Sequence, residues 1–118
     1  SNIILLALAG STWIDVAKGM GMRVAREVFA DRAVNSDGTL VPRSKEGSVI
    51  HDTNEVVERS LRMVTEGKIL SVEGDIVEVE ADSICLHGDT PGAVDMAKTL
   101  KREFLAAGVE VKQLRDIV

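Results

Sequence analysis

The stretch IILLALAGSTWIDVAKGMGMRVAREVFA, residues 3–30, contains two strand-like segments separated by a helical one. Residues 3–9 are continuously aliphatic, which is typical of a buried strand in a parallel sheet. A turn at Gly10-Ser11 leads into the helix, with Ser11 as its N-cap. The predicted buried face of this helix consists of Trp13, Val16, Ala17 and Met20. Residues 24–30 predict a second strand, so the stretch indicates a β-α-β unit with parallel strands.

The middle of the chain continues this alternation with two interruptions. Residues 32–48 form a long polar connection, and loops of that length in compact domains are more often functional than incidental. A helix capped by Asp52 is expected to run to Glu66, where Gly67 ends it. Its predicted buried residues are Val57, Leu61 and Val64. Residues 68–82 then predict a small surface β-hairpin.

The last third of the chain predicts a strand, a helix and a final strand. Residues 83–87 are expected to form a buried strand, and Thr90 and Pro91 to open the helix. The predicted buried face of that helix consists of Val94, Ala97, Leu100 and Phe104. Residues 109–114 are expected to form the final strand. The sequence therefore predicts an α/β fold in the order β-α-β-loop-α-hairpin-β-α-β, with residues 1–118 as a single unit.

Composition narrows the class of protein. The chain has 118 residues, of which 45% are hydrophobic and 28% charged, a balance typical of a globular protein. The net charge of −5 disfavours binding to nucleic acid or to an anionic membrane surface. The long apolar run at residues 3–9 is too short to span a bilayer. A single cysteine excludes an internal disulfide and favours a reducing, cytoplasmic location. Two histidines are too few for a metal site built on several histidines.

The start of the chain also carries information. Ser1-Asn2 leads directly into an apolar strand, and natural chains rarely open on a central strand without a methionine. We therefore expect the chain to be part of a longer protein.

Functional groups in parallel α/β folds gather at the carboxyl ends of the strands. One candidate is the segment His87-Gly88-Asp89. Here His87 could act as a general acid, a general base or a ligand. In the alternative interpretation, Asp89 and Thr90 only cap the helix and His87 faces water.

The second strand ends in another polar group. Glu27, Asp31 and Arg32 could position a substrate or form a structural ion pair. In the long loop, Arg43 could bind a carboxylate or phosphate through two hydrogen bonds, or it could be a solvated charge. Cys85 is expected to be an inert core residue and His51 a surface residue.

Two segments resemble a known family. They are EVFADRAVNSDGTLVPRSKEGSVIHD, residues 27–52, and CLHGDTPGAVDMAKTLKREFLAAGVEV, residues 85–111. Both resemble the LamB/YcsF family, and LALAGS at residues 6–11 fits the same pattern. The resemblance implies a (β/α) barrel-like fold of the glycoside hydrolase/deacetylase type, interrupted here by the small hairpin. It also implies that this chain corresponds to the C-terminal half of that barrel, because the Asp- and His-rich segments of the family's amino-terminal half are absent.

The resemblance implies a reaction as well. The family's characterised role is the A subunit of an ATP-dependent 5-oxoprolinase, which acts with subunits B and C to open 5-oxo-L-proline to L-glutamate. On that basis His87, Asp89 and Asp31 are the expected catalytic residues. Glu27, Arg32 and Arg43 are the expected substrate-binding residues. ATP is the expected co-substrate, and no residue is assigned to a metal. The half-barrel alone is expected to be inactive.

Two other functions remain open at this stage. By analogy of fold, the chain could belong to a metal-dependent carbohydrate hydrolase or deacetylase. It could also be a non-catalytic binding module. A partial barrel exposes apolar strand edges and inner faces, so self-association of the chain is also expected.

Overall fold

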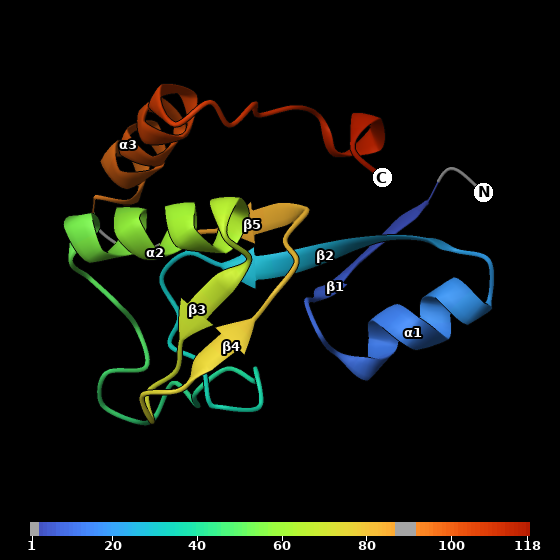
Figure 1. The fold of residues 1–118 in the computed structure, drawn as a ribbon, viewed down its shortest axis with the longest axis horizontal. Coiled ribbons are helices and arrows are strands. Elements are labelled where there is room, and N and C mark those ends of the chain that lie inside the picture. The colour runs from blue at the N-terminus through green and yellow to red at the C-terminus, as the bar shows by residue number, and fades with distance from the viewer. Residues whose placement is uncertain (1–2, 87–91) are drawn as a thin grey trace.

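The computed structural model describes residues 3–86 and 92–118 of the chain. Within these ranges the strands are β1 (Ile4–Leu8), β2 (Arg23–Phe29), β3 (Lys68–Leu70), β4 (Ile76–Glu78) and β5 (Ser83–Cys85). The helices are α1 (Thr12–Gly19), α2 (Thr53–Thr65) and α3 (Ala93–Ala106), followed by a 3-10 turn (Leu114–Asp116). Helix α1 lies at the opposite end of the molecule from α2 and α3 (Figure 1).

The main sheet is parallel, as the sequence predicts. Its strand order is β1-β2-β5, and β2 pairs in parallel with both neighbours. The chain crosses from β1 to β2 through α1, and from β2 to β5 through the long loop, α2 and the β3-β4 hairpin. The hairpin forms a separate antiparallel pair. The α/β class and the hairpin are therefore confirmed.

One face of the main sheet carries the hydrophobic core. Near α1, Val24 packs with Ile14 and Ala17. Farther along β2, Val28 packs with Met63 of α2 and Ile69 of the hairpin. A third cluster joins the end of β2 to α2 and α3, and consists of Ala30, Val56, Leu100 and Phe104. Alternation along the strands places these β-strand side chains on one face.

We call the opposite face of the sheet the uncovered face, because no hydrophobic cluster of the described residues lies on it, although most of its side chains are half-buried. By alternation and register it carries Ile4, Leu6, Leu8, Ala25, Glu27, Phe29, Ser83 and Cys85. Leu6 is 45% exposed, whereas Ala25 is fully buried. None of these side chains belongs to a hydrophobic cluster of the described residues. The prediction of a fully buried first strand is thus wrong: β1 is an edge strand with one covered face.

The predicted buried face of α1 is only partly confirmed. Ala17 is 3% exposed, as predicted, but Trp13 and Met20 are 69% and 72% exposed, and Val16 is exposed too. The second buried residue is Ile14, which was not predicted. The side of the helix with Ile14 and Ala17 packs against the sheet, which leaves the bulky side chains of Trp13 and Met20 facing outward.

Helix α2 begins and ends as predicted. The Asp52 side chain accepts hydrogen bonds from the backbone N–H groups of Asn54 and Glu55, at 2.9 and 3.4 Å. Gly67 follows the helix with φ of 66°, and a Cβ atom there would approach the Val79 carbonyl to 3.0 Å. The predicted stripe Val57, Leu61 and Val64 is half-buried, in the cluster with α3. The fully covered stripe is Val56, Ser60 and Met63.

The buried face of helix α3 differs in part from the prediction. Helix α3 buries Leu100 and Phe104 as predicted, but Val94 and Ala97 are exposed. The described part of this helix begins at Ala93, after Gly92 as N-cap, while the predicted start at Thr90 and Pro91 lies outside the described residues.

The predicted final strand at residues 109–114 is wrong. This segment is irregular and leads into the 3-10 turn. The Val109 N–H turns back to the Phe104 carbonyl at 2.8 Å, and the Arg23 side chain binds the carbonyls of Arg115 and Val118. The segment is therefore held by the end of α3 and by a side chain, without joining the sheet. In the described ranges, no helix combines the length and apolar composition needed to cross a membrane.

Candidate functional site

The carboxyl end of β2 is the most closely held polar region among the described residues. Asp31 and Arg32 lie two and three residues after the last residue of β2, and are only 3% and 7% exposed. The Ala30 N–H donates to the Cys85 carbonyl at 2.9 Å, which fixes this end to β5. From the other side, the Ile50 N–H donates to the Asp31 carbonyl at 2.8 Å. The two predicted site residues therefore occupy a defined position between β5 and the long loop.

Arg59 of α2 reaches the same place. Its Nη1 atom donates to the carbonyls of Phe29 and Ala30, at 3.0 and 2.5 Å. Its Nη2 atom donates to the Arg32 carbonyl at 2.8 Å. Burial lowers the pKa of Arg59, and the nearby charges of Glu55 and Asp31 oppose that shift.

Sequence reasoning did not select Arg59, although a signal exists. Arg59 lies between Val56 and Ser60, inside the stripe of α2 that the structure buries. An arginine at such a position must direct its guanidinium to a partner within the fold, since burying an unpaired charge is costly.

Arg32 is predicted to bind substrate, but its contacts hold the loop. Its Nη2 atom donates to the Val41 carbonyl at 2.8 Å, and its backbone forms an isolated bridge with Val49. The Nε atom is buried without a hydrogen-bond partner among the described residues. These contacts tie the middle of the long loop and the residue that follows it to the end of β2.

Glu27 and Cys85 lie on the uncovered face of the sheet. Phe29 is paired with Cys85, and Glu27 is two residues before Phe29 on the same face. Burial raises the pKa of the Glu27 carboxyl. Burial, followed by the negative charges of Glu27 and Asp31, raises the pKa of the Cys85 thiol. The thiol is therefore protonated near neutral pH, which agrees with its prediction as an unreactive residue.

The other residues selected from the sequence are Arg43, His51, His87 and Asp89. Arg43 is exposed in the long loop, and its carbonyl accepts a hydrogen bond from the Ser48 hydroxyl at 3.2 Å. His51 is exposed, as predicted. His87 and Asp89 lie outside the described residues. Within residues 3–86 and 92–118, no three His, Cys, Asp or Glu side chains form a group that could hold a metal ion.

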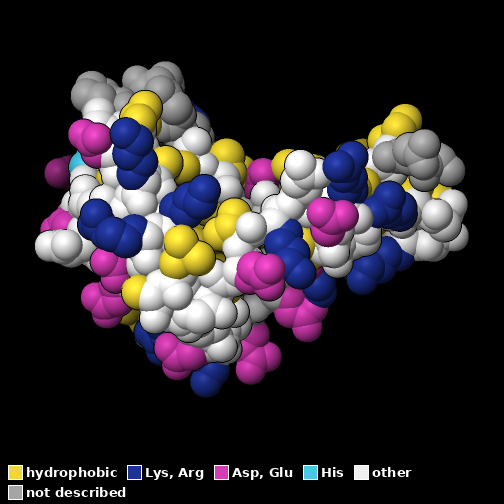
Figure 2. Space-filling view, turned by 90° about the horizontal axis from the view of Figure 1, so that it is seen from above, with side chains coloured by type: hydrophobic (Ala, Val, Ile, Leu, Met, Phe, Trp, Pro, Cys, Tyr) yellow, Lys and Arg dark blue, Asp and Glu magenta, His cyan; other side chains and the backbone are white. Residues whose placement is uncertain are grey.

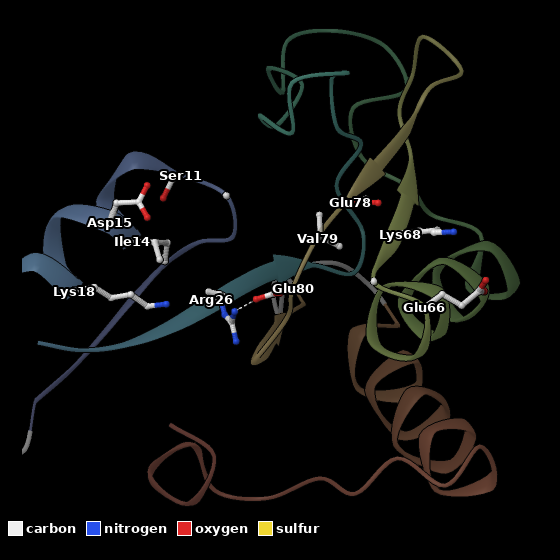
Figure 3. Close-up of a pocket in the computed structure, with 12 residues that line it drawn as sticks. Ser11, Ile14, Asp15, Lys18, Arg26, Glu66, Lys68, Glu78, Val79 and Glu80 are labelled. Atoms are coloured by element: carbon white, nitrogen blue, oxygen red, sulfur yellow. Dashed lines mark hydrogen bonds and ion pairs between the residues drawn. The ribbon is translucent and has the colours of Figure 1, made fainter.

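A large hollow lies elsewhere, between α1 and the hairpin (Figure 3). Its volume is about 580 Å³, and among the described residues its lining includes none of Glu27, Asp31, Arg32 and Arg43. Arg26 in its wall binds the Asp82 carboxylate, with 2.9 Å between Nε and Oδ2, and also pairs with Glu80. Because this cation already has two carboxylate partners, the hollow offers less for an anionic ligand than its size suggests.

Comparison with known proteins places the chain in one family. A profile of the LamB/YcsF family matches residues 1–118. The 5-oxoprolinase A subunit of Coprothermobacter proteolyticus is 50% identical over 117 residues, covering 99% of this chain and 45% of that protein. The corresponding 5-oxoprolinase A subunit of Pyrococcus furiosus is 47% identical over 117 residues, covering 99% of this chain and 46% of that protein. The chain thus spans a little under half the length of the curated relatives it matches.

A solved structure has the same fold. The lactam utilization protein from Thermus thermophilus superposes with a TM-score of 0.84 at 40% sequence identity. The match covers 93% of this chain and 43% of that one.

Proposed function

The chain belongs to the LamB/YcsF family, and we propose that it forms part of the A subunit of an ATP-dependent 5-oxoprolinase. The observation that carries this proposal is the 50% identity to such a subunit over 117 residues. The proposed reaction opens 5-oxo-L-proline to L-glutamate and couples the opening to ATP hydrolysis. The protein would act with subunits B and C, in the cytoplasm.

The chemistry of the substrate explains the need for ATP. A lactam is a stable amide, and its carbonyl carbon is a poor electrophile toward water. Transfer of the γ-phosphoryl group of ATP to the lactam oxygen would make the ring carbon more electrophilic and release ADP. Water would then add to that carbon, the C–N bond would break as the ring nitrogen takes up a proton, and a second water would hydrolyse the resulting acyl phosphate to glutamate and phosphate. A carboxylate that accepts the proton of the first water, and a cation that holds the substrate carboxylate, are the groups such a reaction needs.

The end of β2 supplies candidates for these roles. We assign Asp31 as a catalytic carboxylate, since it is buried at the carboxyl end of a parallel strand. Glu27 is assigned to substrate binding, because it lies two residues before the end of β2, beside Ser83 of β5. Arg43 is the candidate for the substrate carboxylate. Arg32 supports this site by holding the loop that carries Arg43.

His87 and Asp89 complete the proposed catalytic set. They follow β5 in the sequence, and β5 pairs in parallel with β2. Carboxyl ends of neighbouring parallel strands lie at the same edge of a sheet. The proposal therefore draws its residues from two adjacent strands.

The proposed site is part of a larger domain. We propose that residues 1–118 form one unit that corresponds to the C-terminal half of a (β/α) barrel-like domain. The uncovered sheet face supports this, because the core clusters lie on only one face of the described sheet. In a closed barrel the other face would line the interior. This unit alone is therefore proposed to be inactive and to self-associate through its uncovered face.

The test uses the full-length protein together with subunits B and C. We expect release of glutamate from 5-oxoproline that requires ATP. The variant Asp31→Asn should lower kcat by about 10²–10⁴-fold, the usual contribution of a general base. The variant Arg43→Ala should raise KM for 5-oxoproline more than it lowers kcat, whereas Arg102→Gln on the exposed face of α3 is the matched control.

Three outcomes would change the proposal. Unchanged turnover in Asp31→Asn or Arg43→Ala removes that residue from the site. Deacetylation of a carbohydrate that needs a divalent metal but no ATP would favour the hydrolase alternative. Absence of any turnover by the complete complex would favour a binding module.

A further inference from the structure

Arg59 joins α2 to the backbone on both sides of Asp31. Its guanidinium donates to the carbonyls of Phe29, Ala30 and Arg32, over 3.0, 2.5 and 2.8 Å. The remaining carbonyl in this run of four is that of Asp31, which accepts from the Ile50 N–H at 2.8 Å. All four consecutive carbonyls are therefore held, three of them by one side chain.

The reason for this arrangement lies in the end of the strand. Inside a sheet, backbone carbonyls pair with the neighbouring strands, but β2 and β5 stop just before this point. Buried carbonyls beyond the strand end need other donors, because leaving them unpaired costs free energy. Arg59 supplies these donors from a helix that is fixed in turn by Val56 and Ser60, both fully buried.

An arginine suits this task better than a lysine. The guanidinium is planar and carries five N–H groups in a fixed fork, so it can reach several carbonyls at once. A lysine offers three N–H groups from a single atom and cannot reproduce that spread. The charge of Asp31 also acts favourably on the Arg59 cation.

From this geometry we infer that Arg59 is a positioning residue, which acts through the backbone of residues 29–32 to hold the Asp31 carboxylate in its reactive orientation. The inference rests on the proposed function of Asp31. It adds a residue outside the motifs that carry the family resemblance. Arg59 itself is not assigned any contact with substrate.

The experiment compares three variants of the full-length protein in the assembled complex. Arg59→Lys keeps the charge but loses the fork, Arg59→Met removes both, and Arg62→Met changes an arginine one turn further along the same helix. We expect both Arg59 variants to lower kcat by about 100-fold with little change in KM, as expected for a misplaced reactive group. Arg62→Met should turn over like the unsubstituted protein. Thermal melting and co-elution with the partner subunits check that each variant folds and assembles.

A second readout follows Asp31 directly. The side-chain carboxyl carbon of Asp31 is observed by NMR, with and without the Arg59 substitutions. We expect its chemical shift to change in Arg59→Lys and in Arg59→Met, and to stay the same in Arg62→Met. A general structural weakening would not move this resonance selectively.

Each outcome decides the inference. Turnover of Arg59→Lys at the level of the unsubstituted protein overturns it, because the fork would then be dispensable. If Arg59→Met does not fold, Arg59→Lys alone decides. If the unsubstituted complex shows no ATP-dependent glutamate release, the proposed function fails. The NMR comparison of chemical shifts then decides whether Arg59 positions Asp31, and an unchanged Asp31 resonance in Arg59→Lys overturns that.

Discussion

Helices α1 and α2 occupy equivalent places in the chain, yet their surroundings differ sharply. Each helix follows a strand of the parallel sheet and packs on the same face. Helix α2 contacts α3 and β3 in addition, and two of its residues are fully buried. Helix α1 has its main contacts with β1 and β2, and leaves Trp13 and Met20 exposed. Figure 2 shows the same division as a broad part and a narrower part that contains α1.

The comparison shows that neighbouring elements determine how well a crossover helix is held. Both helices carry apolar residues at helical spacing, so their sequences alone would predict similar burial. The difference arises because α2 lies between the hairpin and α3, while α1 is flanked by solvent among the described residues. The exposed apolar side of a helix such as α1 adds stability only when another surface covers it.

The largest expected difference in stability is between two truncations, one of an aromatic residue packed against α2 and one of an aromatic residue on α1. Phe104 is 8% exposed in the cluster that includes Val56 and Leu100. Phe104→Ala should lower the free energy of unfolding by about 3–5 kcal/mol, the cost of a large core cavity. Trp13→Ala should change it by less than about 0.5 kcal/mol, because the side chain is mostly exposed. Urea unfolding of the 118-residue chain measures both. A comparable loss in Trp13→Ala would show that α1 is covered in solution.

Loss of the ion pair between Arg26 of β2 and Asp82, which precedes β5, is expected to give the next largest loss of stability. The Asp82 carboxylate accepts from the Arg26 backbone N–H and Nε, both at 2.9 Å. These bonds, led by the side-chain bond from Arg26, lower the pKa of Asp82 below its usual value of 3.8. Asp82→Asn should therefore reduce the free energy of unfolding at pH 7 by about 1–3 kcal/mol.

The same pair predicts a pH dependence. Because the pKa of Asp82 is lower in the folded state, its stabilising contribution is complete above pH 3.8 and is lost as the pH falls through the folded value. Asp82→Asn should show a shallower loss of stability on acidification, measured by urea unfolding between neutral and acid pH. Asp15→Asn, an exposed change on α1, is the control. An acid response of Asp82→Asn identical to that of the unsubstituted chain would contradict the prediction.

The N-cap of α2 is also held by more contacts than the N-cap of α1. Asp52 accepts hydrogen bonds from two N–H groups of α2, whereas the Ser11 side chain makes no capping bond to α1. Asp52→Ala should cost about 1 kcal/mol, and Ser11→Ala should cost almost nothing. Thermal melting of the two variants provides the measurement. Equal losses would mean that Ser11 caps α1 in solution.

The uncovered sheet face gives the smallest change in stability. Leu6 is 45% exposed there, so Leu6→Thr should alter the free energy of unfolding by less than about 0.5 kcal/mol. The same change should reduce self-association of the 118-residue chain, as seen in sedimentation velocity at increasing concentration. A chain that remains monomeric before substitution would argue against association through this face.

Local patterns predicted some features because their causes are local. The Asp52 cap, the Gly67 helix end and the β3-β4 hairpin each depend on residues adjacent in sequence. The position of Asp31 and Arg32 after β2 follows from where the apolar run stops. Features that depend on distant neighbours were predicted wrongly or only in part, including the buried face of α1 and the strand at residues 109–114.

The candidate site shows the same limit. Glu27, Asp31 and Arg32 could be selected from sequence because they cluster at one strand end. The place of Arg59 between Val56 and Ser60 indicates only that its side chain needs a partner within the fold. Which partner it binds could not be predicted, because the carbonyls lie about thirty residues earlier in the chain, and hydrogen bonds to the backbone leave no residue-type signature in the partner. The use of Arg32 on the Val41 carbonyl was equally hidden.

The amino-acid sequence by itself determined the α/β class, the parallel β-α-β order and the family. These depend on hydrophobic periodicity, turn residues and motifs, all of which are read along the chain. Only the tertiary structure decided which side of α1 is buried, which sheet face remains uncovered and which arginine binds the carbonyls on either side of Asp31. Those outcomes follow from packing and hydrogen bonding between segments far apart in sequence. Several helix faces or hydrogen-bond partners are equally compatible with the local sequence, and the segment that packs nearby selects one of them.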